Sequence, residues 1–591
     1  MNNQDVARTF ETLADMLDIE GQENKFKIIA YRRVAEQIAN LDRDVNALWQ
    51  AGELRSIPGV GQAIEEKIDS LLGAGTFGLY ERLRKEIPAG VVAMLAVPDM
   101  GPKRARLLWK EAGITSVEEL EKKARAGELA GLPGFGRKFE EKIVANIEAT
   151  RRRGASGRSP LGVAYPAAYE LLRRLMQVEG VQRASVAGSL RRMRETIGDI
   201  DLLAAGAEAQ DAGRIMDAFN ALPNVAEVIA RGPTKSSVRL HTGQQVDLRV
   251  IQPKHWGAAL QYFTGSKDHN VRLREIALKK GYSLNEYSLT RMKDGKDFFC
   301  REEVEVYAKL GVPFIPPELR EDQGEFTGEL PRLLEIGDLR GDLQMHTHWS
   351  DGERSVEDMA RAAKARGYEY ILITDHSQSL GVTNGLSPER LKRQRAEIDT
   401  VNAMHLGIRV LQGSEVEIKA DGTLDYPDDV LASLDIVLAS LHTSLRQERD
   451  RVTRRALAAI RNPHVDVFAH PTGRMLYEGG ALEKGREGAD LDMEAVLQAA
   501  AETGTIVEIN ADPQRLDLRD THARRANELG CLFSIDTDAH QPESLAQIHY
   551  GVAVARRAWI TAERVANTWP LDKLMAYVKT DSQSLRRANR P

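Results

Sequence analysis

The chain has 591 residues, of which 42% are hydrophobic and 28% are charged, and its formal net charge is −6. This composition predicts a globular protein of several packed domains, and the net charge gives no indication of a nucleic-acid partner. The beginning of the chain lacks a signal-peptide pattern, no apolar run approaches the roughly 20 residues that span a bilayer, and only Cys300 and Cys531 occur, so we expect a cytoplasmic protein without a disulfide framework.

A weak internal repeat organises the first 150 or so residues. A glycine-containing turn precedes an amphipathic helix three times, in IPGVGQAIEEKI (57–68), VPDMGPKRARLL (97–108) and LPGFGRKFEEKI (132–143). Such glycines let backbone amides at a helix N-terminus approach a phosphate. The repeats resemble helix-hairpin-helix DNA-binding modules, although Asp99 replaces the first glycine of the middle copy. The implied DNA contacts are Gly59, Gly61, Gly101, Gly134 and Gly136.

The first 85 or so residues resemble the small lyase domain of DNA polymerase β. Lys67 falls at the position of the Schiff-base lysine, six residues after the second glycine of the first repeat. Phe26 replaces a histidine of the phosphate pocket and Ala63 replaces a lysine. A nucleophilic lysine needs a lowered pKa, so Lys67 stays open between lyase catalysis and a surface lysine paired with carboxylates. The residues that match binders of a gap 5′-phosphate are Lys27, Tyr31 and Arg55.

The segment GSLRRMRETIGDIDLL contains two carboxylates one residue apart. If Ile200 and Leu202 are buried positions of a strand, Asp199 and Asp201 project together from its other face. Such neighbours repel unless they share a proton or hold a cation. Asp247, in QQVDLRV, lies on a second predicted half-buried strand. Three oxygen ligands suit Mg²⁺ or Mn²⁺, whereas the DID pattern taken alone favours a solvated strand edge.

The residues before these carboxylates predict an anion site. ASVAGSLRR indicates a short strand, then Gly188, and then Ser189 at a helix N-cap, so free amides would face an anion. Arg192, one helical turn along, can reach the same anion with its guanidinium. Together with the three carboxylates, this arrangement predicts nucleotidyl transfer with two metal ions.

These segments and YFTGSKDHNVRLREIALKKGYSLNEYSL resemble the palm and nucleotide-selecting segments of family X DNA polymerases, the group that contains polymerase β. The resemblance implies that Asp199, Asp201 and Asp247 hold two Mg²⁺ or Mn²⁺ ions. Without it, the two adjacent aromatics of this segment would indicate ordinary core. The implied nucleotide contacts are Gly188, Ser189 and Arg192 at the triphosphate, Tyr262 and Phe263 at the sugar, Gly265 and Ser266 in the turn, Asn270 at the base edge, and Arg274 on the template side.

A stretch rich in proline, glycine and acidic residues (310–331) indicates a linker. Beyond it, hydrophobic runs that end in polar residues alternate with amphipathic segments, which predicts a parallel barrel. Chemistry in such barrels gathers at the carboxyl ends of the strands. The amphipathic segments are 355–366, 387–403, 449–461, 491–502 and 521–529.

Histidines and carboxylates occupy those strand ends. His346 and His348 are one residue apart on one strand, and Asp538 and His540 repeat this spacing on the last. A single histidine is more often structural. So many at equivalent positions predict a metal centre, and the mixed ligands suit Mn²⁺, Zn²⁺ or Fe²⁺.

This half resembles the polymerase and histidinol phosphatase (PHP) domain, a distorted seven-stranded barrel that holds up to three Mn²⁺ or Zn²⁺ ions. The implied chemistry is a 3′-to-5′ exonuclease or other 3′-end processing in which metal-activated water attacks a phosphoester. A small-molecule phosphatase and a structural domain are the alternatives. Asp375 is expected to orient ligands, and Arg474 is either a phosphate contact or part of a salt bridge. The implied ligands are His346, His348, Asp351, His376, Glu415, His442, His470, Asp538 and His540.

We therefore expect a multidomain α+β and α/β chain that binds gapped or nicked DNA and dNTPs, acts as a monomer and fills gaps in DNA repair. The rival hypothesis is a DNA-binding scaffold whose catalytic centres are idle. The expected domains are a helical lyase-like domain (1–85), a helix-hairpin-helix subdomain (86–155), a nucleotidyltransferase palm (156–252), a thumb-like nucleotide-selection subdomain (253–317), a linker (318–338) and a distorted (β/α)7 PHP barrel (339–591).

Overall fold

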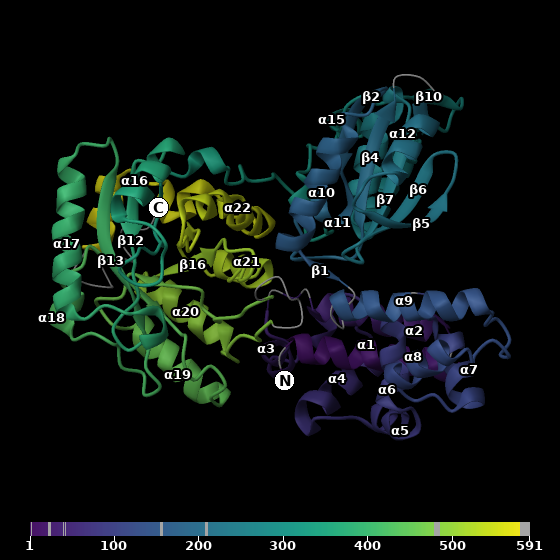
Figure 1. Cartoon of the computed structure of the whole chain (residues 1–591), viewed down its shortest axis with the longest axis horizontal. Helices are drawn as coiled ribbons and strands as arrows, with labels where there is room; N and C mark the ends of the chain where they lie inside the picture. Colours follow the sequence, from purple (N-terminus) through teal and green to yellow (C-terminus); the bar gives the residue numbers. More distant parts are fainter. Residues whose placement is uncertain are drawn as a thin grey trace. The chain divides into compact units, whose positions relative to one another are not determined.

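The chain forms two compact units, Met1–Arg158 and Ser159–Pro591 (Figure 1). No helix among the described residues is long and apolar enough to cross a membrane. The computed structural model describes the chain except for residues 2, 22–24, 40, 42, 98, 154–157, 207–210, 478–484 and 580–591, and except for the side chains of 148–153.

The first unit is helical throughout its described residues. Its longest helix shows why: Phe10, Leu13 and Leu17 recur at the spacing of one helix face, and all are buried. They join a hydrophobic core to which the other helices of the unit contribute. The helices are α1 (Asn3–Glu20), α2 (Lys25–Ala39), α3 (Val45–Gln50), α4 (Gln62–Ala74), α5 (Gly78–Glu86), α6 (Ala89–Ala93), α7 (Pro102–Ala112), α8 (Val117–Ala126) and α9 (Arg137–Arg153).

The three repeats form three glycine-containing turns, before α4, α7 and α9. Gly59 and Gly134 have φ angles of 88° and 84°, in the left-handed region that favours glycine. Asp99 adopts φ of 65° at the equivalent position of the middle repeat, which aspartate tolerates better than most residues. Its carboxylate lies 3.0 Å from Lys142 Nζ. The turn therefore persists without the glycine.

The second unit begins with a five-stranded sheet in the order β2-β4-β7-β6-β5. Strands β4 and β7 are parallel and the other neighbours are antiparallel. Helices α10 and α12 contact this sheet. The elements are β1 (Ser159–Pro160), α10 (Leu161–Leu175), β2 (Val181–Val186), α11 (Gly188–Arg191), β3 (Thr196–Ile197), β4 (Ile200–Gly206), α12 (Asp211–Asn220), β5 (Val225–Arg231), β6 (Lys235–Leu240) and β7 (Gln245–Ile251).

A smaller subdomain follows, with a three-stranded sheet in the order β10-β9-β8 and a core of its own. Its sheet is antiparallel. Helix α13 packs on α15, and α14 packs on β8. The elements are α13 (Trp256–Thr264), α14 (Lys267–Lys279), β8 (Tyr282–Leu284), β9 (Leu289–Arg291), β10 (Lys296–Phe298) and α15 (Glu303–Lys309).

The rest of the unit is a barrel of seven parallel strands, β11 to β17, which are neighbours in chain order. A parallel bridge between Met345 and Ala539 joins the continuations of the first and last strands. This confirms the predicted fold class. The strands are β11 (Gly341–Asp342), β12 (Tyr370–Ile373), β13 (Arg409–Glu417), β14 (Ile436–Ser440), β15 (Val467–Phe468), β16 (Ile506–Asn510) and β17 (Phe533–Asp536), and the helices are α16 (Val356–Ala365), α17 (Pro388–Ala403), α18 (Asp428–Leu431), α19 (Arg449–Ile460), α20 (Met493–Thr503), α21 (Asp520–Glu528), α22 (Ile548–Arg557) and α23 (Leu571–Val578).

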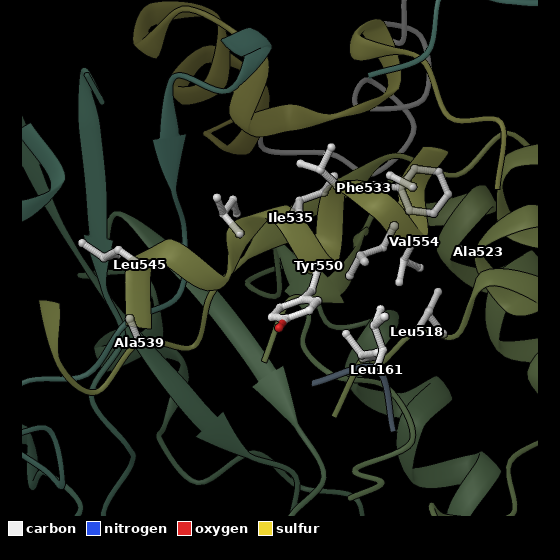
Figure 2. Packing of buried hydrophobic residues seen from close by; sticks show 14 of the residues in the cluster. Leu161, Leu518, Ala523, Phe533, Ile535, Ala539, Leu545, Tyr550 and Val554 are labelled. Atoms are coloured by element: carbon white, nitrogen blue, oxygen red, sulfur yellow. The ribbon is translucent and has the colours of Figure 1, made fainter. Parts of the chain in front are cut away.

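The palm sheet and the barrel share one continuous hydrophobic core within the second unit. Figure 2 shows Leu161, the first residue of α10, near Leu518 and Tyr550 of the barrel domain. The ring of Tyr165, one turn further along α10, lies 5.5 Å from that of Tyr550. The start of α10 is therefore packed against the barrel domain.

Candidate functional site

The two central strands of the palm sheet bring the three predicted acidic residues together. Asp201 on β4 is the direct partner of Asp247 on β7 in the parallel register, and Asp199 immediately precedes β4. One carboxylate oxygen from each lies within 4.8 Å of the others. Ile200 and Leu202 are buried at 0% and 2% exposure on the opposite face, which is the alternation that the sequence predicted.

The electrostatics of this trio favour a cation. Burial, with Asp199 and Asp247 nearby, raises the pKa of Asp201 to about 7. Burial also opposes ionisation of Asp247, but hydrogen bonds from Lys235 and Gln245 lower its pKa on balance. Carboxylate oxygens whose ionisation is opposed by burial and by one another are a fitting site for a hard divalent cation. Lys235, which forms an ion pair with Asp247, was not identified from the sequence because it lies on the neighbouring strand β6.

The position before the predicted anion site has no room for a side chain, which explains the glycine there. Gly188 has a φ of 59°, and a Cβ there would overlap the Asp201 carboxylate. The expected helix N-cap at Ser189 is wrong: α11 begins at Gly188 and its N-cap is Ala187. Ser189 is therefore the second residue of α11.

Arg192 is anchored at two of its three guanidinium nitrogens. Its Nε lies 3.1 Å from Glu321 Oε1, and its Nη1 donates to the Thr264 carbonyl at 2.7 Å. Among the described residues, no hydrogen bond from Nη2 is found. Two anchored nitrogens and one unengaged nitrogen make a preorganised donor for an anion.

The predicted base-side residues gather around the junction of α13 and α14. Gly265 ends α13 with φ of 26°, and Ser266 N-caps α14 by accepting from His269 N at 3.2 Å. Asn270 donates to the Tyr262 carbonyl at 2.7 Å, and the ring of Phe263 lies 5.1 Å from that of Tyr262. Arg274, one turn further along α14, is exposed. Its Nε donates to the Asn270 carbonyl at 3.2 Å.

Glu415, fully buried on β13, lies at the centre of the barrel cluster. Its Oε1 lies 2.5 Å from His470 Nε2 and 3.1 Å from His442 Nε2. Its Oε2 lies 3.2 Å from His376 Nδ1 and 3.4 Å from His346 Nε2. One carboxylate therefore faces four imidazoles supplied by four strand ends.

Asp351 and Asp538 complete the cluster. Asp351 lies 3.8 Å, 3.5 Å and 3.6 Å from nitrogens of His346, His376 and His540, and Asp538 Oδ1 lies 3.0 Å from His346 Nε2. Asp538 also has a φ of 52°, a strained value for a non-glycine residue that functional sites tend to hold.

His348 is the predicted ligand that the structure does not bring into these groups. Its ring is exposed and its Nδ1 lies 3.3 Å from the Arg354 carbonyl.

The sequence left Arg474 open between a phosphate contact and a salt bridge. In the structure Arg474 is buried and pairs with Glu195 of the palm at 2.6 Å.

The nitrogens of this cluster fit a metal centre. Burial opposes protonation of His442, yet Glu415 and Glu417 raise its pKa to about 9, and the pKa of His540 is likewise raised to about 9 despite burial, first by Asp351. Such imidazoles would exchange protons for metal ions on binding. Within the part of the chain that the structure describes, five buried imidazole nitrogens form no well-aligned hydrogen bond, although some lie near carboxylate oxygens, and a metal would satisfy them. They are His346 Nδ1 and Nε2, His376 Nδ1, His442 Nε2 and His470 Nδ1.

Two further carboxylates orient these residues. Asp375, expected in that role, accepts from Thr347 N at 2.9 Å and Ser350 N at 3.1 Å, in the loop that leads to Asp351. Glu417 was not identified from the sequence, although it follows Glu415 by two residues and so faces the same side of β13. Its Oε2 lies 2.9 Å from His442 Nδ1.

In the first unit, Lys67 is half-buried on α4 and donates from Nζ to the Ala63 carbonyl at 2.8 Å. Its Nζ lies 5.9 Å from the centre of the buried Tyr31 ring. Among the described residues it forms no ion pair, whereas Arg55 pairs with Glu65 at 2.6 Å. Lys27 is exposed on α2.

Family models match four parts of the chain. The DNA polymerase beta thumb matches residues 259–321 and the PHP domain matches 342–512. A helix-hairpin-helix domain matches residues 1–77, and a SAM-like helix-hairpin-helix tandem matches 91–149. The thumb, the barrel and the hairpin repeats predicted from the sequence are thereby confirmed.

The DNA polymerase/3′-5′ exonuclease PolX of Bacillus subtilis (strain 168) is 39% identical to the chain over 583 residues, which is 98% of the chain and 100% of that relative. The chain belongs to the PolX family. Other relatives of this PolX family member match about two fifths of the chain. Proteins named probable phosphatase from Thermoanaerobacter sp. (strain X514) and Edwardsiella ictaluri (strain 93-146) are each 30% identical, over 257 and 239 residues, and cover 41% and 39% of the chain and 96% and 90% of their own lengths.

Proposed function

We propose that this PolX family member fills short gaps in DNA by template-directed addition of dNTPs and trims 3′ ends at its barrel centre. The observation that supports polymerisation most directly is the convergence of Asp199, Asp201 and Asp247 within 4.8 Å on paired strands. An arginine with one unengaged guanidinium nitrogen lies on the adjoining turn. The three carboxylates and the arginine together provide the metal ligands and the phosphate contact that nucleotidyl transfer requires.

In the palm, the three carboxylates would hold two Mg²⁺ or Mn²⁺ ions. When bound, such ions activate a 3′-hydroxyl and neutralise charge on a triphosphate. Asp201 has to lose its proton before it can act as a ligand, because its pKa is about 7. Gly188 leaves room for that carboxylate, and Arg192 offers Nη2 to a phosphate oxygen.

In the barrel, the same reasoning favours a 3′-to-5′ exonuclease that uses Mn²⁺, Zn²⁺ or both. The ions would supply a water activated for attack on a phosphodiester. Glu417 keeps His442 Nδ1 occupied at 2.9 Å, so that its Nε2 stays directed at Glu415. The two buried free cysteines suit a cytoplasmic protein, and we propose that it acts as a monomer on gapped or nicked DNA.

The polymerase proposal is tested on a one-nucleotide gap with Mg²⁺ and with Mn²⁺. We expect Asp201→Asn and Asp247→Asn to reduce incorporation about a hundred- to a thousandfold and to leave release of nucleotides from 3′ ends intact. If both variants incorporate dNTPs at the wild-type rate, the chain is a scaffold at this site and the proposal fails.

The similarity of about two fifths of the chain to proteins named probable phosphatase supports one competing substrate class, a small phosphorylated molecule. Release from single-stranded 3′ ends and from phosphorylated metabolites is therefore compared in Mn²⁺, with His346→Ala as the control that removes a buried cluster residue. A preference for metabolites would favour the phosphatase.

We also propose that the first unit binds the 5′-phosphate of a gap through Lys27, Tyr31 and Arg55. For lyase chemistry, the half-buried Lys67 would have to form a Schiff base with an abasic 5′ end. Borohydride trapping of such an end, lost in Lys67→Ala and retained in Lys27→Ala at saturating DNA, is the expected result. Trapping that persists in Lys67→Ala would remove that lysine from the proposal.

A further inference from the structure

Arg557 of the barrel domain contacts Arg192, the predicted triphosphate contact, directly and through Glu321. Arg557, the last residue of α22, donates from Nη1 to the main-chain carbonyl of Arg192 at 2.8 Å. The same nitrogen lies 3.1 Å from Glu321 Oε1, the atom that accepts from Arg192 Nε. The two contacting residues are 365 positions apart in the chain.

The contact is buried, so solvent screens it little. The side chains of Arg557, Glu321 and Arg192 are 5%, 13% and 13% exposed. Arg557 is itself fixed, because its Nε donates to Asp520 Oδ2 at 2.7 Å at the start of α21, a helix that packs on α22. Figure 1 shows α21 and α22 as neighbouring helices. A buried guanidinium with fixed carboxylates on two sides has little freedom to move.

The surrounding packing makes the same connection. Helix α10 of the palm packs on the barrel domain through Leu161 (Figure 2) and through Tyr165, whose ring lies 5.5 Å from that of Tyr550. Glu195, in the loop between Arg192 and Asp199, pairs with Arg474 of the barrel at 2.6 Å. The segment that leads from the anion site to the acidic trio therefore contacts barrel residues at Arg192 and at Glu195.

We propose that Arg557 is a positioning residue for the polymerase reaction: it fixes Glu321 and the Arg192 backbone so that Arg192 Nη2 is held ready for the triphosphate of an incoming dNTP. The inference rests on the proposed role of Arg192 in nucleotide binding. It assigns the exonuclease barrel a second task, which is to complete the nucleotide site of the other active centre.

The test is steady-state incorporation on gapped DNA by the full chain, with 3′-end release measured on the same preparations. In Arg557→Gln we expect the KM for dNTP to rise about tenfold, with kcat within about twofold, because an interaction made in both ground and transition states is lost. Exonuclease release should match the wild type. The matched control is Arg556→Gln, on the same helix, which loses its pair with Glu318 but no contact with Glu321.

A second variant protects the test against misfolding, since Arg557→Gln leaves Glu321 and Asp520 short of a buried partner. Glu321→Gln replaces the carboxylate between Arg557 Nη1 and Arg192 Nε by a neutral amide and leaves every residue of the barrel in place. It weakens the hold on Arg192 Nε, so its KM for dNTP should also rise. If melting curves show that Arg557→Gln does not fold, an unchanged KM in Glu321→Gln overturns the inference.

Arg192→Ala separates the two possible failures. If Arg192→Ala leaves the KM for dNTP unchanged, the proposed nucleotide role of Arg192 is wrong, and the inference falls with it. If Arg192→Ala raises that KM while folded Arg557→Gln keeps the wild-type value, the nucleotide role stands and the positioning role of Arg557 is refuted. A rise in Arg556→Gln equal to that in Arg557→Gln would show a general effect of α22 and would also refute it.

Discussion

Replacing Glu417 tests whether a carboxylate that touches no substrate sets the metal affinity of the barrel. Glu417 Oε2 receives His442 Nδ1 at 2.9 Å and His442 N at 3.1 Å. Its Oε1 receives Thr443 N at 3.0 Å and Thr443 Oγ1 at 2.6 Å. The side chain thus fixes both the ring of His442 and the loop that carries it.

The size of the effect follows from these four contacts. Loss of an outer partner of a ligating histidine typically costs about 10- to 100-fold in metal affinity, which corresponds to about 1.4 to 2.8 kcal/mol. A hydrogen bond to a charged group is worth a comparable 1.5 to 3 kcal/mol or so. We therefore expect Glu417→Ala to bind Mn²⁺ about 10- to 100-fold more weakly, and Glu417→Gln to lose less, because its amide oxygen can still accept from Thr443.

The assay is Mn²⁺ binding by calorimetry together with the metal content of the purified protein, neither of which depends on turnover. The matched control is Glu353→Gln, which removes a charge from an exposed residue whose N–H lies 2.8 Å from the His540 carbonyl. Incorporation on gapped DNA should be unaffected in all variants. Wild-type Mn²⁺ affinity in Glu417→Ala would refute the reasoning.

Three further predictions follow from the described contacts. The pKa of Asp201 is raised to about 7, so below that pH Mg²⁺ has to displace a proton from this carboxyl group. Calorimetry in two buffers should therefore show proton release and weaker Mg²⁺ binding at pH 6, and little proton release at pH 8. Equal Mg²⁺ affinity at the two pH values would contradict this prediction. Lys235 pairs with Asp247, and its side chain is 40% exposed. Lys235→Gln removes this partly screened positive charge, so it should strengthen Mg²⁺ binding at pH 8 about threefold. Weaker Mg²⁺ binding in this variant would contradict the prediction. Phe533 is fully buried in the barrel core (Figure 2), so Phe533→Ala should lower the free energy of unfolding by about 3 to 5 kcal/mol. The control Val382→Ala, at a fully exposed position, should change that free energy by less than about 0.5 kcal/mol. Equal losses of stability in the two variants would exclude the packing explanation.

Local periodicity sufficed for much of the architecture. The segments expected at 387–403 and 449–461 are helices Pro388–Ala403 and Arg449–Ile460 in the structure, because an amphipathic helix leaves its pattern within a single stretch of chain. Alternation likewise predicted that Asp199 and Asp201 lie opposite buried Ile200 and Leu202. The helix cap at Ser189 was wrong, since the helical turn begins at Gly188, which lies against the Asp201 carboxylate of β4.

The sequence by itself determined which chemical groups are present and on which faces of strands and helices they lie, because those properties depend on residue type and spacing. Tertiary structure decided what each group meets. Burial is the main cause of the raised pKa of Asp201, and Asp199 and Asp247, the latter on a neighbouring strand, add to it. The orientation of His442 depends on Glu417 from another strand, and the anchoring of Arg192 depends on Glu321 and Arg557. Burial and pairing between segments far apart in the chain produce these effects, and neither leaves a periodic trace in sequence.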